Sequence, residues 1–129
     1  MVAAHRFRAW FREEMRKVFE EVDVILAPAT PFHAPKSGTK TVVLDGEELP
    51  TRANIGIFTQ PISFVGLPVV AVPVWLEGAG LPIGVQVIAP AWREDIALRV
   101  AHQLAADGIT SAPVARRTEG GQAEGGRAG

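Results

Sequence analysis

The spacing of apolar residues predicts two amphipathic helices. Residues 5–22 carry apolar side chains at steps of three and four, which places them on one face of a helix. Residues 93–106 show a narrower stripe of the same kind. Glu94 and Asp95 fall in the first turn of this second helix, where the helix dipole favours anions, and Gly108 is a natural stop after it.

Three short apolar runs predict strands, namely Val22–Ala27, Val69–Val74 and Ile83–Ile88. Apolar side chains would line both faces of each run, which is typical of buried strands in the middle of a sheet. We expect the first strand to be parallel to its neighbour. The third should be antiparallel to the second, because the connection is short. Pro73 has no N–H donor and therefore belongs at a strand end or on an unpaired side.

The middle of the chain predicts a hairpin followed by a helical segment. Residues 41–49 form two short polar strands around Asp45–Gly46, a pair that suits a type I′ turn at the surface. Residues 51–58 predict a short helix. Pro61 disfavours a continuous helix, so Thr59–Ile62 is either a break or the start of a new helix.

Strands interspersed with helices indicate an α/β fold class. With 129 residues the chain is one domain or part of one. We place the ordered domain at residues 1–111. Residues 112–129 consist mainly of Ala, Gly, Arg and Glu without a period, and this composition predicts a disordered tail.

Composition excludes several classes of protein. The formal net charge of −1 supplies no basic excess for a nucleic-acid partner. The chain has no cysteine, which excludes disulfides, thiol catalysis and thiolate metal sites. Its apolar runs are shorter than the ~18 residues that a membrane span requires. We therefore expect a cytoplasmic protein with neither a nucleic-acid nor a membrane partner.

Motif chemistry is sparse. His5, His33 and His102 lack metal-ligand spacing, so no metal site is expected. A Ser63–His102–Asp23 triad lacks both the Gly-x-Ser-x-Gly elbow and an oxyanion hole. The glycines form no phosphate-binding loop, and no cofactor is expected. On its motifs alone, the chain holds no self-contained catalytic site.

Four segments in a fixed order are more informative. They are DVILAPATPFHAP at 23–35, FTQPISFVGLPVVAVPV at 58–74, LPIGVQVIA at 81–89 and WREDIALRVAHQL at 92–104. Together they resemble the C-terminal portion of the amidase signature family, the Ser–Ser–Lys amidohydrolases. The resemblance covers residues 5–108. RANIGIFTQPIS at 52–63 and AWRED at 91–95 are similar to the subgroup that acts on biuret-type and urea-derived amides.

The resemblance implies a large mixed sheet covered by helices and hydrolysis of linear amides without a cofactor. In that family one serine attacks the carbonyl, a second serine relays the proton and a lysine is the base, while backbone N–H groups hold the oxyanion. The Gly-Gly-Ser-Ser signature of the family is missing here, and none of the three serines and three lysines matches the motif. No catalytic residue is therefore assigned, and we expect the chain alone to be inactive.

The same resemblance places a short segment near the substrate. Phe58, Thr59 and Gln60 precede a core strand, and the hydroxyl and amide of the last two can bond an amide or a carboxylate. The alternative is that they cap the break before Pro61. Gln86 lies on a buried strand, and we expect its amide to bond neighbouring backbone, because buried amides must be satisfied.

The sequence thus predicts the C-terminal fragment of an amidohydrolase that cleaves the C–N bond of a linear amide. It would supply core strands and part of the pocket wall, and Met1 would fall in mid-domain. The expected partners are a small linear amide, the missing N-terminal amidase half and further copies of the chain through self-association. Two alternatives remain open: a non-catalytic interaction piece of a split amidase, and an independent small α/β binding domain.

Overall fold

The computed structural model describes residues 2–114. It confirms the α/β class. The elements in chain order are α1 (Val2–Val18), β1 (Ile25–Pro28), β2 (Thr41–Leu44), β3 (Glu47–Pro50), α2 (Thr51–Asn54), α3 (Gln60–Val65), β4 (Val69–Val74), β5 (Ile83–Ile88) and α4 (Glu94–Ala106). Of the predicted tail at 112–129, residues 115–129 lie outside the described part.

The main sheet has three strands in the order β1-β5-β4. The antiparallel pairing predicted for β4 and β5 is confirmed, with Val70 opposite Val87. The parallel orientation predicted for the first strand is wrong, because β1 runs antiparallel to β5 with Leu26 opposite Val87. This strand also covers Ile25–Pro28 instead of Val22–Ala27. Of the three strands, β5 alone has a neighbour on each side within residues 2–114, whereas β1 and β4 each have one side of the ladder open there.

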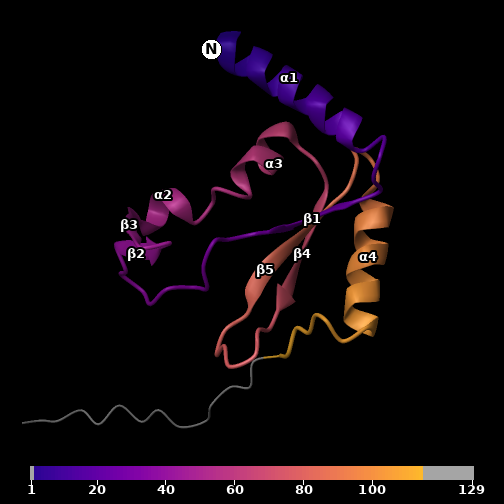
Figure 1. The fold of residues 1–129 in the computed structure, drawn as a ribbon. Coiled ribbons are helices and arrows are strands. Elements are labelled where there is room, and N and C mark those ends of the chain that lie inside the picture. Colours follow the sequence, from indigo (N-terminus) through magenta and orange to yellow (C-terminus); the bar gives the residue numbers. More distant parts are fainter. Residues whose placement is uncertain (1, 115–129) are drawn as a thin grey trace, which may run out of the picture.

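One face of the sheet packs against α4 (Figure 1). The core between them consists of Val72, Val87, Ala89 and Ala97. Ala97 is fully buried, and its small side chain lets the helix approach the strands closely. The predicted stripe is confirmed for Ala97, Ala101 and Leu104, which pack on this core, whereas Ala105 and Leu98 are exposed. Leu26, on the same face of β1, keeps 54% of its surface exposed.

Pro73 lies on the outer side of the edge strand β4. Its carbonyl accepts a hydrogen bond from Thr110 Oγ1, and Val74 forms an isolated bridge with Thr110. The nitrogen and the carbonyl of one strand residue point to the same side. The missing N–H of Pro73 therefore faces away from β5, as predicted for a strand proline.

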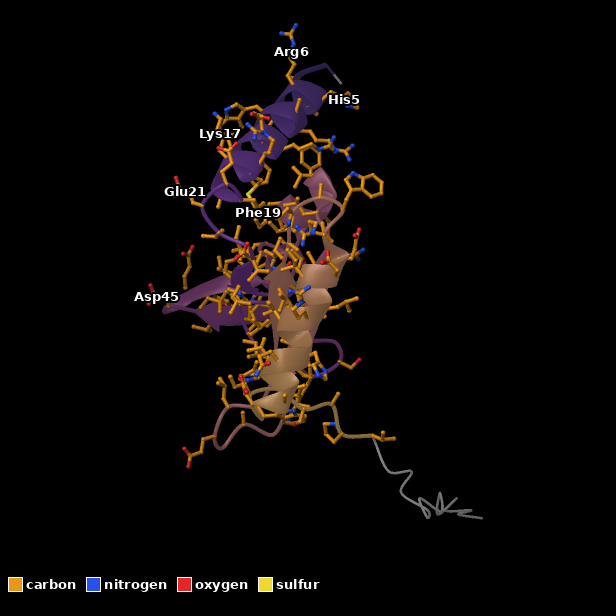
Figure 2. All side chains as sticks on the ribbon, turned by 90° about the vertical axis from the view of Figure 1, so that its right-hand side faces the viewer. His5, Arg6, Lys17, Phe19, Glu21 and Asp45 are labelled. Atoms are coloured by element: carbon orange, nitrogen blue, oxygen red, sulfur yellow. The ribbon has the colours of Figure 1, made fainter. Side chains whose placement is uncertain are left out.

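The hairpin of β2 and β3 is confirmed. Asp45 and Gly46 have φ angles of 50° and 81°, the positive values that a type I′ turn requires at both central residues. The hairpin stands apart from the main sheet, together with α2 (Figure 1). Figure 2 shows Asp45 at its outer tip.

The first helix is shifted from its predicted range of 5–22 to Val2–Val18. Turn-type hydrogen bonds follow its end, from Glu20 N–H to Lys17 O and from Glu21 N–H to Val18 O. Among the described elements, α1 contacts only α3. Figure 2 shows α1 extending beyond the sheet, with His5 and Arg6 at its far end. No helix among residues 2–114 combines the length and the apolar character needed to cross a bilayer.

The segment between the hairpin and β4 holds two short helices. The predicted helix at 51–58 is confined to Thr51–Asn54. A new helix starts at Gln60 with Pro61 in its first turn, where a missing N–H does no harm. Of the two alternatives for this segment, the new helical start is therefore correct. Gly66 ends α3 with a φ of 74°, a left-handed conformation that favours glycine.

Candidate functional site

The turn before α3 holds the three residues predicted to lie near the substrate. Thr59 occupies the N-cap position, but its side chain makes no capping hydrogen bond. Its hydroxyl donates instead to Gly56 O at 3.3 Å. The Thr59 side chain thus bonds within the break before Pro61 and does not cap the first N–H groups of α3. The hydroxyl closes the turn and keeps its own lone pairs free to accept.

Gln60 is the one member of the three that lines a groove. The groove has a volume of about 720 Å³ and lies between α1 and α3, where its walls are Phe7, Phe11, Ile57, Gln60, Pro61 and Phe64. The Gln60 side chain folds back over Gly56, because a Cβ on that glycine would lie 3.0 Å from Gln60 Nε2. The groove is thus apolar except for one amide, which offers a donor and an acceptor.

The aromatic rings along this groove lie close to one another. Phe7 stacks on Phe11 with ring centroids 6.1 Å apart, and it lies 6.3 Å from the Phe64 ring. Trp10 lies 5.5 Å from Phe7. We call Phe7, Trp10, Phe11 and Phe64 the aromatic cluster. The guanidinium of Arg8 lies 5.7 Å from the Phe64 ring centre, a distance at which the ring attracts a cation.

Gln86 fixes the back of the same turn. It is 2% exposed, and its Nε2 donates to Pro28 O at 3.0 Å and to Phe58 O at 3.1 Å. The expectation that Gln86 bonds neighbouring backbone is confirmed. The Phe58 carbonyl is therefore already occupied. Neither Phe58 nor Thr59 lines the groove.

A second hollow of about 610 Å³ lies between the middle of α1, the end of α3 and the start of α4. Polar atoms enter it from Arg12, Ser63 and Glu94, beside the Trp92 ring. Arg12 is anchored by a 3.1 Å hydrogen bond to Val65 O. Trp92 is 89% exposed and has a φ of 66°, an uncommon conformation for a bulky residue. Sequence reasoning missed this hollow, because the segments that line it are far apart in the chain and no pattern along the sequence shows that they meet.

The triad considered from the sequence is not assembled. Ser63 lies on α3 and His102 on α4, and within the described chain no Cα of one helix comes within 8 Å of a Cα of the other. Among the described residues, no group of three His, Asp or Glu side chains is placed to hold a metal. Lys17 donates a hydrogen bond to Glu14 at 2.8 Å, which raises the pKa of Lys17 and favours its protonated form.

Residues 1–98 match the family model described as Amidase. The chain belongs to the amidase family. It is 45% identical over 107 residues to AtzE, a 1-carboxybiuret hydrolase subunit of Pseudomonas sp. (strain ADP), covering 82% of this chain and 23% of that protein. It is 37% identical to a fatty acid amide hydrolase of Medicago truncatula, covering 78% and 16%. It is 40% identical to one subunit of the glutamyl-tRNA(Gln) amidotransferase of Geobacter metallireducens, covering 77% and 19%.

Solved amidase structures have the same fold. An inhibitor-bound complex, described as a vestigial complex that reveals the origins of an s-triazine catabolic enzyme, superposes with a TM-score of 0.81 at 43% identity. The superposition covers 84% of this amidase chain and 24% of the chain in that complex. A crystal structure of an amidase gives a TM-score of 0.71 at 32% identity, covering 78% and 23%. The family and fold predicted from the four segments are confirmed, and the chain spans about a quarter of these relatives or less.

Proposed function

We propose that this chain is the C-terminal portion of an amidase that hydrolyses the C–N bond of a linear amide. The match of residues 1–98 to the amidase family carries this proposal. In it, the chain supplies core strands and one wall of the substrate pocket, while the serine nucleophile, the relay serine and the lysine base come from the rest of the domain. Biuret-type and urea-derived amides are the proposed substrates, because a 1-carboxybiuret hydrolase subunit is 45% identical.

Gln60 is the residue we assign to substrate contact. Its amide stands at the rim of an otherwise apolar groove, and a primary amide donates and accepts at the same time. That pairing matches a substrate amide, which presents a carbonyl oxygen beside an N–H.

The exposed apolar surface supports a larger domain. Phe7, Trp10 and Phe64 of the aromatic cluster remain exposed, as does Leu26, and extended apolar patches on soluble proteins mark interaction surfaces. Within residues 2–114 the fully packed apolar residues are only Ile62, Val65, Val72, Val87, Ile88, Ala89 and Ala97. This small core favours a piece of an amidase over an independent binding domain. The remainder can lie in the same polypeptide or in a separate one. The cytoplasmic location stays a prediction.

Complementation tests the proposal. The chain is produced together with the part of the Pseudomonas protein that lies outside the match, and ammonia release from biuret is followed. We expect turnover only from the combination. Gln60→Leu should raise KM about tenfold, the loss of about one hydrogen bond to substrate, and change kcat little. Gln103→Leu, on the exposed side of α4, is the control and should leave both unchanged. A combined protein that assembles without turnover would contradict the proposal.

A further inference from the structure

Gln86 joins two loops that are far apart in the sequence. Its side chain points away from α4, because the next residue, Val87, belongs to the core under that helix and strand side chains alternate. On this other face, one nitrogen reaches the carbonyl of Pro28 at the end of β1 and that of Phe58 before α3. The two acceptors are 58 and 28 residues from Gln86 along the chain.

The surroundings suit a glutamine at this position. Gln86 stands opposite Ala27 on β1 and opposite Ala71 on β4, and these two small side chains leave room for a long one between them. An amide nitrogen has two hydrogens, one for each carbonyl. The reverse orientation of the amide would set its oxygen against two carbonyl oxygens. The hydrogen bonds therefore fix the rotamer as well as the two loops.

A second contact holds the Pro28 side of this arrangement. Ala29 N–H donates to Gly84 O at 2.7 Å, and a Cβ at Gly84 would lie only 3.0 Å from the Ala29 Cβ. Glycine at this position therefore allows the loop to approach β5. On the other side, the hydrogen bond from Gln86 is the one bond that ties the Phe58 carbonyl to β5 within the described residues. The turn of Phe58–Gln60 thus depends on Gln86 more than the Pro28 loop does.

We propose that Gln86 is a positioning residue that holds the Phe58–Gln60 turn against β5, in the placement that directs the Gln60 amide to the groove. This role of Gln86 rests on the proposed function, because that function assigns Gln60 to substrate contact. Gln86 itself acts through the two carbonyls and does not line the groove. Removing its donors leaves two carbonyls without partners, which loosens the turn nearest to them.

Amide hydrogen exchange on the full chain tests this without substrate. Gln86→Met removes the donors and keeps the length of the side chain. The reporters are the N–H groups of Thr59 and Gln60, both bonded to Gly56 O, and we expect their exchange to accelerate about tenfold. Gln103→Met is the matched control. It makes the same change of side chain and removes an amide on α4 that donates to Asp107 Oδ1, away from the turn.

A pH-dependent rescue separates positioning from simple destabilisation. Gln86→Glu presents a carboxylate to two carbonyl oxygens at neutral pH, but its protonated form can donate to one of them. The protection factors of Thr59 and Gln60, which relate each exchange rate to that of an unstructured amide at the same pH, should then rise as the pH falls, whereas those of Gln86→Met should stay low. Uniform acceleration that includes α4, or no acceleration at the turn, would overturn the proposal. Neither result depends on catalysis, so the complementation assay tests the proposed function separately.

Discussion

Self-association of the isolated chain should depend on the aromatic cluster. Phe7 and Trp10 each keep 55% of their surface exposed. At about 200 Å² per aromatic side chain, the two leave roughly 220 Å² open, which corresponds to about 5 kcal/mol of burial per protomer at ~25 cal/mol per Å². Only the surplus over the entropic cost of association appears as affinity. We therefore expect weak self-association that the two rings largely determine.

The perturbation is the double variant Phe7→Gln with Trp10→Gln. Glutamine is a good helix former, so α1 should persist while the apolar area is lost. We expect the dissociation constant of self-association to rise at least about tenfold, equivalent to 1.4 kcal/mol. Sedimentation velocity over a range of concentrations measures this change, and circular dichroism checks that the helix content is kept.

Leu98 provides the control for exposure alone. It is 60% exposed on α4, and its neighbours one turn away include Glu94, Asp95 and His102, so it stands alone among polar residues. Leu98→Gln should leave self-association unchanged. An equal effect of Leu98→Gln, or an unmodified chain that sediments as a 13.8 kDa monomer at every concentration, would refute the reasoning.

Three further predictions follow from the structure. The chain alone should release no ammonia from biuret or simple amides, and sustained turnover by the repurified chain would contradict the assignment of catalysis to other residues. Gly66→Ala should lower the free energy of unfolding by about 1–2 kcal/mol because of its positive φ, while Gly80→Ala, with open space and no positive φ, should change it by less than about 0.5 kcal/mol in denaturant titrations. The hydrogen bond from Arg16 lowers the pKa of Glu13 below its ordinary 4.5, so this pair stabilises α1 above pH 4.5 and the stabilisation is lost as the pH falls through the lowered pKa. Amide signals of α1 should report this loss, and the Glu13→Gln variant should not show the pH dependence.

Local sequence signals predicted the elements that depend on neighbouring residues. The Asp45–Gly46 turn follows from the conformational freedom of its two residues. The antiparallel pairing of β4 and β5 follows from their short connection. The direction of β1 could not be predicted in this way. Its partner β5 lies almost 60 residues further on, and an apolar run fits a parallel or an antiparallel neighbour equally well.

The site was predictable only in part. The family resemblance located the turn at Phe58–Gln60, but periodicity carries no information on which of the three side chains faces a groove. That outcome depends on the Gln60 amide folding over Gly56 and on Gln86 occupying the Phe58 carbonyl. The helix end was missed for a related reason. The apolar stripe continues to Val22, whereas the hydrogen bonds of α1 give way to turns after Val18.

This chain forms part of an amidase fold, and we expect its open surfaces to meet the rest of that fold. Sedimentation velocity of an equimolar mixture with the remaining part of the Pseudomonas protein tests it most directly. We expect a single 1:1 species, with weaker assembly for the Phe7→Gln, Trp10→Gln variant. Two species that sediment independently, with this chain monomeric and cooperatively folded by itself, would contradict it.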